Sequence, residues 1–376
     1  MSKRILIVSD CPTHPVVGGN RQCMLQYAEI LRTIGYDLYF LFVRVDEIPE
    51  KELVEMREYW GNHYFQYYTP KLQYLYQKIR RKIERRYFFD KVDVYYPWGL
   101  TSFVNKLHSE YHFYGMIVNY IWLSKLAESI VPRKTIFTHD VFANRNNRPG
   151  CYWMSFTQEE EAKAISRFKE VLSIQDEETD YYRSIAPQSH VRTVYSSFRF
   201  VEQKVNGNKN ILFFSGAGSL NLDGIKRFID DVFPQLIKRD PEVYLLLGGN
   251  ICSLLETTQL HPNIILKGRY ENPDDFYALG DICINPVFSG SGLKIKTLEA
   301  LAHGKLTIVD PHSALGIYRA DNVPLLRAKT EEEYVDYILG YLQNIEKLEL
   351  NRKACCVYIS DLNNYIINQY RETFID

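Results

Sequence analysis

Residues 289–305, SGSGLKIKTLEALAHGK, combine glycines, lysines and a glutamate at spacings that suit the binding of an anion. The glycines let the backbone approach a ligand closely. A helix predicted to begin near Leu293 offers free N–H groups and the positive end of its dipole, and Lys294 and Lys296 add two positive charges. The stretch therefore predicts a phosphate or diphosphate site lined by Ser289, Gly290, Ser291, Gly292, Leu293, Lys294 and Lys296.

Glu299 lies three residues after Lys296 and shares its helix face. It would hold Lys296 in place or accept hydrogen bonds from a sugar ring. The alternative is that Lys294 and Lys296 are ordinary solvated residues and that Glu299 merely pairs with one of them, because lysines on helix surfaces are common. Which interpretation holds depends on the elements that position the stretch.

Short apolar runs followed by polar loops alternate with helical segments along the chain, which predicts parallel βαβ units. In the first half the runs are KRILIVSD, YDLYFLFV, HFYGMIVNY, KTIFTHD and EVLSIQDEE. After a polar break at residues 206–210, they are ILFFSGAG, VYLLLGG, NIILKGR, DICINPVF and KLTIVD. The predicted fold class is α/β, with two doubly wound Rossmann-like domains facing across a cleft.

The expected domain bounds are 1–200 for the N-terminal domain and 201–355 for the C-terminal domain. The closing segment is helical, and residues 356–376 are expected to form a helix that crosses back to the N-terminal domain. Ligands of such sheets bind outside the carboxyl ends of the strands, so the loops after the strands are the places to search.

One such loop, FTHDVFANRNNR, carries titratable and polar groups to the predicted ligand edge. A lone histidine at a strand end is more often structural than catalytic. Here His139 is followed directly by Asp140, and perturbable groups cluster at functional sites, which favours a functional role. We expect His139 to be catalytic, and Asp140, Asn144 and Arg145 to line the cleft on the acceptor side.

Residues 211–310 resemble the C-terminal, nucleotide-sugar-binding domain of GT-B glycosyltransferases, specifically retaining family 4. The matching segments are ILFFSGAGSLNLDGIKRFI, VYLLLGG and the stretch from ILKGRY to KLTIVD, in the family's order. The family's signature is a pair of glutamates seven residues apart. The second is Glu299, which the resemblance implies contacts the donor ribose, whereas Ser291 stands in place of the first.

The resemblance also implies where the donor diphosphate finds its counter-charge. Basic residues that elsewhere follow the domain's first strand are missing from SGAGSLNLDG, and Lys294 and Lys296 would replace them. Further donor contacts are implied for Gly216, for Arg269 and Tyr270 over the nucleobase, and for the double glycine Gly18 and Gly19 before the first helix.

The expected function is transfer of a sugar from a UDP- or GDP-type nucleotide-diphosphate sugar to a glycan, lipid-linked or protein-linked acceptor. Such transfer serves polysaccharide or glycoconjugate biosynthesis, and the resemblance implies retention. No metal or other cofactor is expected, since the chain has no D-x-D and no zinc spacing. Two alternatives stay open: a GT-B-like epimerase or phosphorylase, and a non-catalytic nucleotide-sugar-binding partner subunit.

Composition limits the partners and the cellular compartment expected for the protein. The net charge of −1 gives no field that would attract nucleic acid. Seven cysteines without a C-x-x-C pair indicate a reducing compartment. No signal-peptide or membrane-spanning run is evident, so we expect a cytoplasmic protein, or one at the cytoplasmic face of a membrane.

Residues 71–91, KLQYLYQKIRRKIERRYFFDK, interleave lysine and arginine with aromatic and aliphatic residues. As a helix, this segment would place apolar groups on one face and cations on the other, which suits an anionic membrane surface. Peripheral membrane contact is one expectation for it. The alternative is an ordinary amphipathic helix whose apolar face packs on its own domain.

Overall fold

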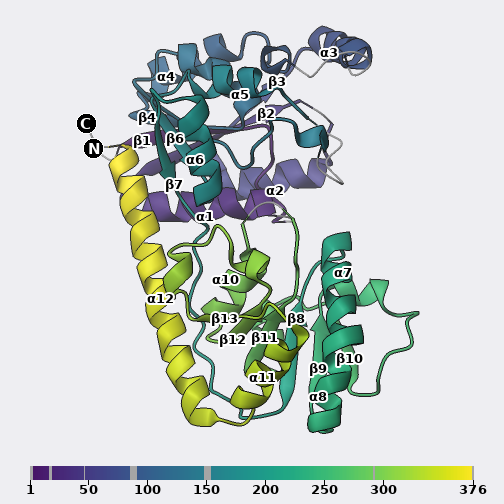
Figure 1. The fold of residues 1–376 in the computed structure, drawn as a ribbon. Coiled ribbons are helices and arrows are strands. Elements are labelled where there is room, and N and C mark those ends of the chain that lie inside the picture. Colours follow the sequence, from purple (N-terminus) through teal and green to yellow (C-terminus); the bar gives the residue numbers. More distant parts are fainter. Residues whose placement is uncertain are drawn as a thin grey trace. The chain divides into compact units, whose positions relative to one another are not determined.

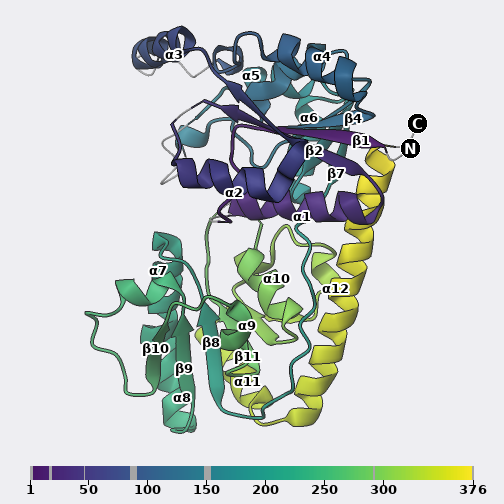
Figure 2. The same ribbon diagram turned by 180° about the vertical axis from the view of Figure 1, so that it is seen from behind.

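The computed structural model describes residues 3–16, 19–45, 47–84, 91–147, 154–290 and 293–374. The chain divides into two compact units, each built on a parallel sheet (Figures 1 and 2). Unit 1 runs to Ser196 and also takes in the chain from Ile366 onward, whereas unit 2 is Ser197–Tyr365. The divisions thus fall four residues before the predicted boundary at 200 and ten residues after the one at 355.

Unit 1 contains a seven-stranded sheet in the order β3-β2-β1-β4-β5-β6-β7. Each neighbouring pair is parallel, as the alternation of strands and helices predicts. Its strands are β1 (Arg4–Ser9), β2 (Asp37–Arg44), β3 (Tyr64–Tyr68), β4 (Gly115–Asn119), β5 (Arg133–Phe137), β6 (Glu170–Ser173) and β7 (His190–Thr193).

Helices cover both faces of this sheet (Figure 1). Leu6 and Val8 of β1 belong to a core shared with α4, η3, α5 and α6, and Tyr27 of α1 and Trp60 of α2 stack on Phe137 and Phe40. The α-helices are α1 (Gly19–Thr33), α2 (Glu50–Trp60), α3 (Lys71–Glu84), α4 (Leu100–Tyr111), α5 (Gln158–Ile165) and α6 (Asp176–Ile185). The 3-10 helices are η1 (Gly61–His63), η2 (Val92–Val94), η3 (Ile121–Glu128) and η4 (Arg145–Asn147).

Unit 2 contains a six-stranded parallel sheet in the order β10-β9-β8-β11-β12-β13. Its strands are β8 (Asn210–Phe214), β9 (Tyr244–Gly248), β10 (Ile264–Gly268), β11 (Ile282–Asn285), β12 (Leu306–Val309) and β13 (Leu325–Arg327). Its helices are α7 (Ser219–Arg227), the π-helical η5 (Phe228–Val232), α8 (Phe233–Arg239), η6 (Asn250–Leu254), α9 (Pro273–Tyr277), α10 (Ile295–Ala302), η7 (Pro311–Ala314), η8 (Ala320–Asn322), α11 (Glu331–Tyr341) and the part of α12 (Ile345–Thr373) that ends at Tyr365; the rest of α12 belongs to unit 1.

Both sheets have a point where the strand order reverses, between β1 and β4 in unit 1 and between β8 and β11 in unit 2. Ligands of doubly wound sheets bind at this point, outside the carboxyl ends of the strands. In unit 2 the loops that meet there follow β8 and β11, and residues 289–305 begin in the second of them. No helix in the described part of the chain is long and apolar enough to cross a membrane.

Candidate functional site

The β11–α10 turn, residues 286–294, follows the carboxyl end of β11. Gly290 has a φ of 123°, which side chains rarely adopt, and a Cβ on it would lie 3.1 Å from Leu220 Cδ1. The backbone conformation therefore favours glycine, and a Cβ there would also require the Leu220 side chain to shift. Ser291 and Gly292, predicted to line the site, lie outside the described residues, as does Gly18 of unit 1.

Lys294 closes this turn. It is the N-cap of α10, so the helix begins at Ile295 rather than near Leu293. The Nζ atom of Lys294 lies 3.3 Å from the carbonyl oxygen of Gly290 and 3.2 Å from Nε2 of His312. The same Nε2 is 2.8 Å from the Gly290 oxygen. Lys294 and His312 thus converge on one carbonyl group, and the ammonium group is held over the turn.

His312 is a residue of this site that the sequence reasoning missed. It follows β12 in η7, and its backbone N–H donates to Asp310 Oδ1 at 2.8 Å. Pro311 occupies the first position of that helical turn, where its missing N–H costs nothing. The available signal was the segment KLTIVDPH, in which a histidine follows a predicted strand at the ligand edge of the sheet.

Lys296 reaches across to the loop that follows β8. Its Nζ atom lies 2.5 Å from Oδ1 of Asn221 on α7, and Nδ2 of Asn221 donates to the carbonyl oxygen of Gly216 at 3.1 Å. Burial, together with the nearby charge of Lys294, lowers the pKa of Lys296 to about 8. A positive charge thus stands against the loop after β8, whose segment SGAGSLNLDG contains no lysine or arginine.

Glu299 occupies the next turn of α10. Its Oε2 accepts a hydrogen bond from the hydroxyl of Tyr277 at 3.2 Å, and burial raises the pKa of the carboxyl group. The ring of His303 stacks on Tyr277 with centroids 4.1 Å apart, and its two nitrogens contact Glu299 O at 2.7 Å and Asp274 Oδ1 at 2.9 Å. Tyr277 therefore holds the carboxylate of Glu299, and His303 contacts the backbone oxygen of the same residue.

The arrangement can bind a ligand with a negative part and a hydroxylated part. Lys294, Lys296 and the first N–H groups of α10 supply positive charge at the carboxyl end of β11. Glu299, one turn further along the helix, supplies a hydrogen-bond acceptor. Within the described residues, no group of three or more His, Cys, Asp or Glu side chains is placed to hold a metal ion.

The other residues predicted for the donor side lie on neighbouring loops of unit 2. Gly216 is exposed after β8, and Ser289 is half-buried in the β11–α10 turn. Arg269 and Tyr270 follow β10, where Arg269 is exposed and Tyr270 packs edge-on against Phe276 with centroids 5.4 Å apart. The loop after β10 thus offers one exposed cation and one ring packed on its neighbour.

His139 of unit 1 is buried just after β5, in a left-handed backbone conformation with φ of 65°. Burial lowers its pKa to about 3, so the imidazole is neutral at physiological pH. Its Nε2 lies 2.8 Å from Oδ1 of Asn119, an oxygen that also accepts a hydrogen bond from Tyr27 at 3.0 Å. An oxygen acceptor requires a proton on Nε2, which leaves Nδ1 as the lone-pair nitrogen.

The loop after His139 is held by one ion pair and one buried carboxylate. Arg145 contacts Asp140 with Nη2 to Oδ2 at 3.0 Å, and Asn144 is exposed with φ of 51°. Glu161, which was not predicted, is fully buried and accepts a hydrogen bond from the backbone N–H of Phe142 at 2.8 Å. Gly19, predicted as a donor contact, is the first residue of α1.

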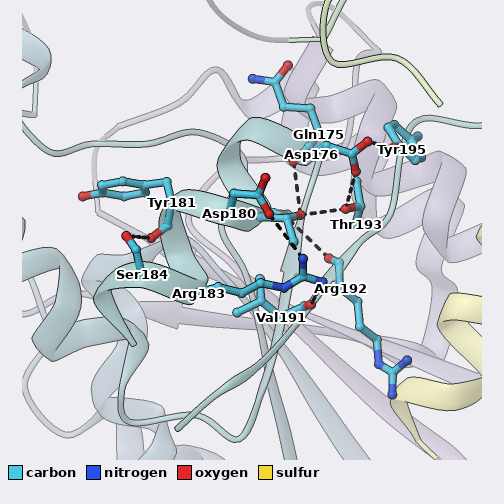
Figure 3. Close-up of polar contacts among 12 residues, drawn as sticks. Gln175, Asp176, Asp180, Tyr181, Arg183, Ser184, Val191, Arg192, Thr193 and Tyr195 are labelled. Carbon is cyan, nitrogen blue, oxygen red and sulfur yellow. Dashed lines mark hydrogen bonds and ion pairs between the residues drawn. The ribbon is translucent and has the colours of Figure 1, made fainter. Parts of the chain in front are cut away.

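A chain of hydroxyl groups fixes the start of α6 (Figure 3). Thr193 and Tyr195 donate to the two carboxylate oxygens of Asp176 at 2.8 and 2.6 Å. Thr179 lies 2.7 Å from the Thr193 hydroxyl and 3.2 Å from the carbonyl oxygen of Gln175. The carboxylate in the first turn also complements the helix dipole. The loop between β6 and α6 is therefore rigidly held.

Glu178, in the first turn of α6, is the second unpredicted carboxyl group of unit 1. It is buried, and it receives a hydrogen bond from Gln175 Nε2 on Oε1 at 3.2 Å, while Oε2 has no hydrogen-bond partner. Burial and the nearby charge of Asp140 raise the pKa of this carboxyl group to about 8. The segment SIQDEE indicates that Glu178 follows a strand, but the sequence alone does not show that its side chain is buried.

Comparison with known proteins shows that most of unit 2 is similar to a known family. Residues 208–344 match the family model described as glycosyl transferases group 1. The family resemblance predicted from the sequence is therefore confirmed. The matched region contains the β11–α10 turn, Lys294, Lys296, Glu299 and His312.

Relatives and solved structures extend the match to the whole chain. An uncharacterized 44.6 kDa protein in the cps region of Klebsiella pneumoniae is 22% identical over 387 residues, covering 93% of each chain. Anabaena HepE in complex with UDP superposes with a TM-score of 0.65 at 14% identity over 99% of each chain. A mutant of S. aureus TarM, in complex with fondaparinux, α-GlcNAc-glycerol and UDP, gives 0.63 at 12% identity over all of both chains. The predicted GT-B fold is confirmed, and the family match supports sugar transfer.

Proposed function

We propose that the protein is a glycosyltransferase that moves a sugar from a nucleotide-diphosphate sugar to an acceptor, with retention of configuration. The observation that carries the proposal is the pair Lys294 and Lys296 at the start of α10. Lys296 stands against Asn221, beside the loop after β8, and Lys294 is held over the Gly290 carbonyl. Two cations at the strand-order reversal of a group 1 domain suit a diphosphate.

The donor would lie on unit 2 with its diphosphate over the β11–α10 turn. Glu299 would accept hydrogen bonds from the ribose hydroxyls, and its contact with Tyr277 orients the carboxylate. Arg269 and Tyr270 would cover the base. UDP is the first nucleotide to test, because the neighbours HepE and TarM were both solved with UDP.

The lysines would act on the transition state by stabilising the negative charge that develops on the leaving diphosphate. The leaving phosphate would then take the proton of the acceptor hydroxyl on the same face of the sugar, so the configuration is retained without a covalent intermediate. The two ammonium groups would supply the charge that a divalent cation supplies elsewhere, so we propose a metal-independent reaction.

His139 would serve as a neutral hydrogen-bonding group rather than as a titrating base. Its pKa of about 3 keeps the ring uncharged, and its Nε2–H is engaged by Asn119. Asp140, Asn144 and Arg145, on the loop that follows, are proposed to contact the acceptor. The acceptor class is a glycan, a lipid-linked sugar or a protein.

Thermal unfolding against a panel of nucleotides and nucleotide sugars tests the proposal. A ligand at 100 times its dissociation constant adds about 2.7 kcal/mol to the free energy of unfolding, which is easily measured. We expect one nucleotide series to stabilise the wild type and to have no effect on Lys294→Ala/Lys296→Ala. Lys226→Ala, which removes an exposed lysine from the last turn of α7, is the matched control.

Turnover assays with the stabilising donor then separate the proposed reaction from its alternatives. His139→Gln should keep the nucleotide-induced shift but lose transfer. Donor conversion without an acceptor would indicate an epimerase, and dependence on inorganic phosphate a phosphorylase. Ser291, which stands where the family has its first glutamate, is the residue that favours a non-catalytic binding subunit. Nucleotide binding without any turnover would support that alternative.

A further inference from the structure

Helix α3 packs on unit 1 through glutamines. Gln73 and Gln77 are fully or almost fully buried, one turn apart. Nε2 of Gln73 donates to the carbonyl oxygen of Tyr96 at 2.6 Å, while its Oε1 accepts a hydrogen bond from the backbone N–H of Trp98, also at 2.6 Å. Nε2 of Gln77 donates to Val94 O at 2.8 Å. The helix is thus attached by polar contacts to the segment before α4.

The apolar side chains of the same helix point away from the protein. Leu72, Leu75 and Ile79 remain 77%, 55% and 54% exposed, at spacings of three and four residues that align them on one face. Tyr76 joins this stripe and lies beside Trp98, with ring centroids 5.9 Å apart, and Trp98 itself is 53% exposed. The expectation that the apolar face packs on its own domain is wrong for these residues.

A row of lysines borders the apolar stripe. Lys71, Lys78 and Lys82 are exposed and share a helix face, since they are separated by seven and four residues. Residues 71–82 contain no acidic residue. Figures 1 and 2 show α3 at the outer edge of unit 1. The rest of the predicted segment, residues 85–90, lies outside the described residues.

We propose that α3 docks unit 1 on an anionic lipid surface, with the helix lying in the plane of the interface. Leu72, Leu75 and Ile79 would enter the boundary between headgroups and acyl chains, and the lysines would meet the anionic headgroups. Trp98 and Tyr76 have amphipathic rings, which favour a position at the level of the lipid headgroups. The apolar stripe explains why the helix is held by glutamines, because that attachment leaves the stripe free.

Flotation of the full-length protein with lipid vesicles tests the proposal. We expect binding to vesicles of phosphatidylcholine mixed equally with phosphatidylglycerol, and little binding to phosphatidylcholine alone. Leu72→Gln/Leu75→Gln/Ile79→Gln should reduce binding to background. Lys71→Gln/Lys78→Gln/Lys82→Gln should weaken it on the order of 100-fold, since each basic residue contributes about fivefold. Leu350→Gln/Val357→Gln, which alters exposed apolar residues of α12, should bind like the wild type.

Because the changed side chains are exposed, all three variants should unfold at the wild-type temperature. Their nucleotide-induced stabilisation should also be unchanged. Vesicle binding therefore tests the membrane proposal, and nucleotide-induced stabilisation tests the proposed function independently. The proposal is overturned if the wild type does not float with anionic vesicles at low salt, or if the α3 variants float as the wild type does. Self-association that is lost only in the apolar variant, without vesicle binding, would instead identify a contact between two copies.

Discussion

The side chain of Lys296 is half-buried, yet its proposed task is to carry a positive charge. Burial and the Lys294 ammonium lower its pKa to about 8, which means that the free protein sits close to losing this charge. A bound diphosphate would reverse the effect, because its negative charge stabilises the ammonium form. Binding and protonation of Lys296 are therefore coupled.

We expect the affinity for UDP to change little between about pH 7 and pH 8, where its terminal phosphate is already ionised, and to fall as the pH rises further. Below that pKa the lysine is already charged, whereas above it each binding event must take up a proton, so the loss approaches tenfold per pH unit. Isothermal titration on either side of pH 8 measures this. Lys296→Gln should bind weakly at every pH, and Lys226→Gln should keep the wild-type profile. An affinity that does not change across this range in the wild type would contradict the role of Lys296.

Single residues of the site differ in how far the sequence predicts them. Lys294, Lys296 and Glu299 stand out because a strand, a glycine turn and a helix surround them. The bond from Lys296 to Asn221 joins residues 75 apart in the chain, and no local pattern contains it. The contact of His312 with the Gly290 carbonyl oxygen also joins two different loops, so it too is invisible in the local sequence. Such partners depend on which strands become neighbours, which is a property of the sheet.

At the scale of elements, the β11–α10 turn makes a prediction through Gly290. Gly290→Ala should lower the free energy of unfolding by about 1–3 kcal/mol, because φ of 123° strains any side chain and the new Cβ would meet Leu220. It should also weaken UDP binding. Gly340→Ala, on the exposed side of α11 with no atom near its Cβ, should stabilise the protein by about 0.5–1 kcal/mol. Denaturant unfolding measures both changes, and equal effects would exclude a special role for the turn.

The sequence predicts all of the inner strands and, among the four edge strands, only β10, which begins with three apolar residues. All ten apolar runs correspond to strands of the structure. The three unpredicted strands, β3, β7 and β13, lie at sheet edges, where exposure on one side admits residues such as Gln66, His190 and Arg327. These three strands lack the continuous apolar run by which a buried parallel strand is recognised. Helix α3 is a related case, since its composition predicts amphipathicity but not which face is buried.

For the whole molecule, the alternation of apolar strand segments with helical segments is enough to predict the fold. The proposed function depends instead on where a few charged residues lie. The chain has a net charge of −1, yet α3 and the start of α10 each carry lysines with no acidic residue between them. Acidic residues occupy the first turns of α5 and α6 instead, where they complement the helix dipoles. An almost neutral protein can therefore present one surface to anionic lipid and another to a diphosphate.

The central claim is that the two lysines of α10 bind the diphosphate of a nucleotide sugar. A crystal structure of the protein with UDP tests it most directly. We expect phosphate oxygens within about 3 Å of Nζ of Lys294 and of Lys296, as charge-assisted hydrogen bonds require, and a ribose hydroxyl on Glu299. A diphosphate that touches neither lysine would contradict the account.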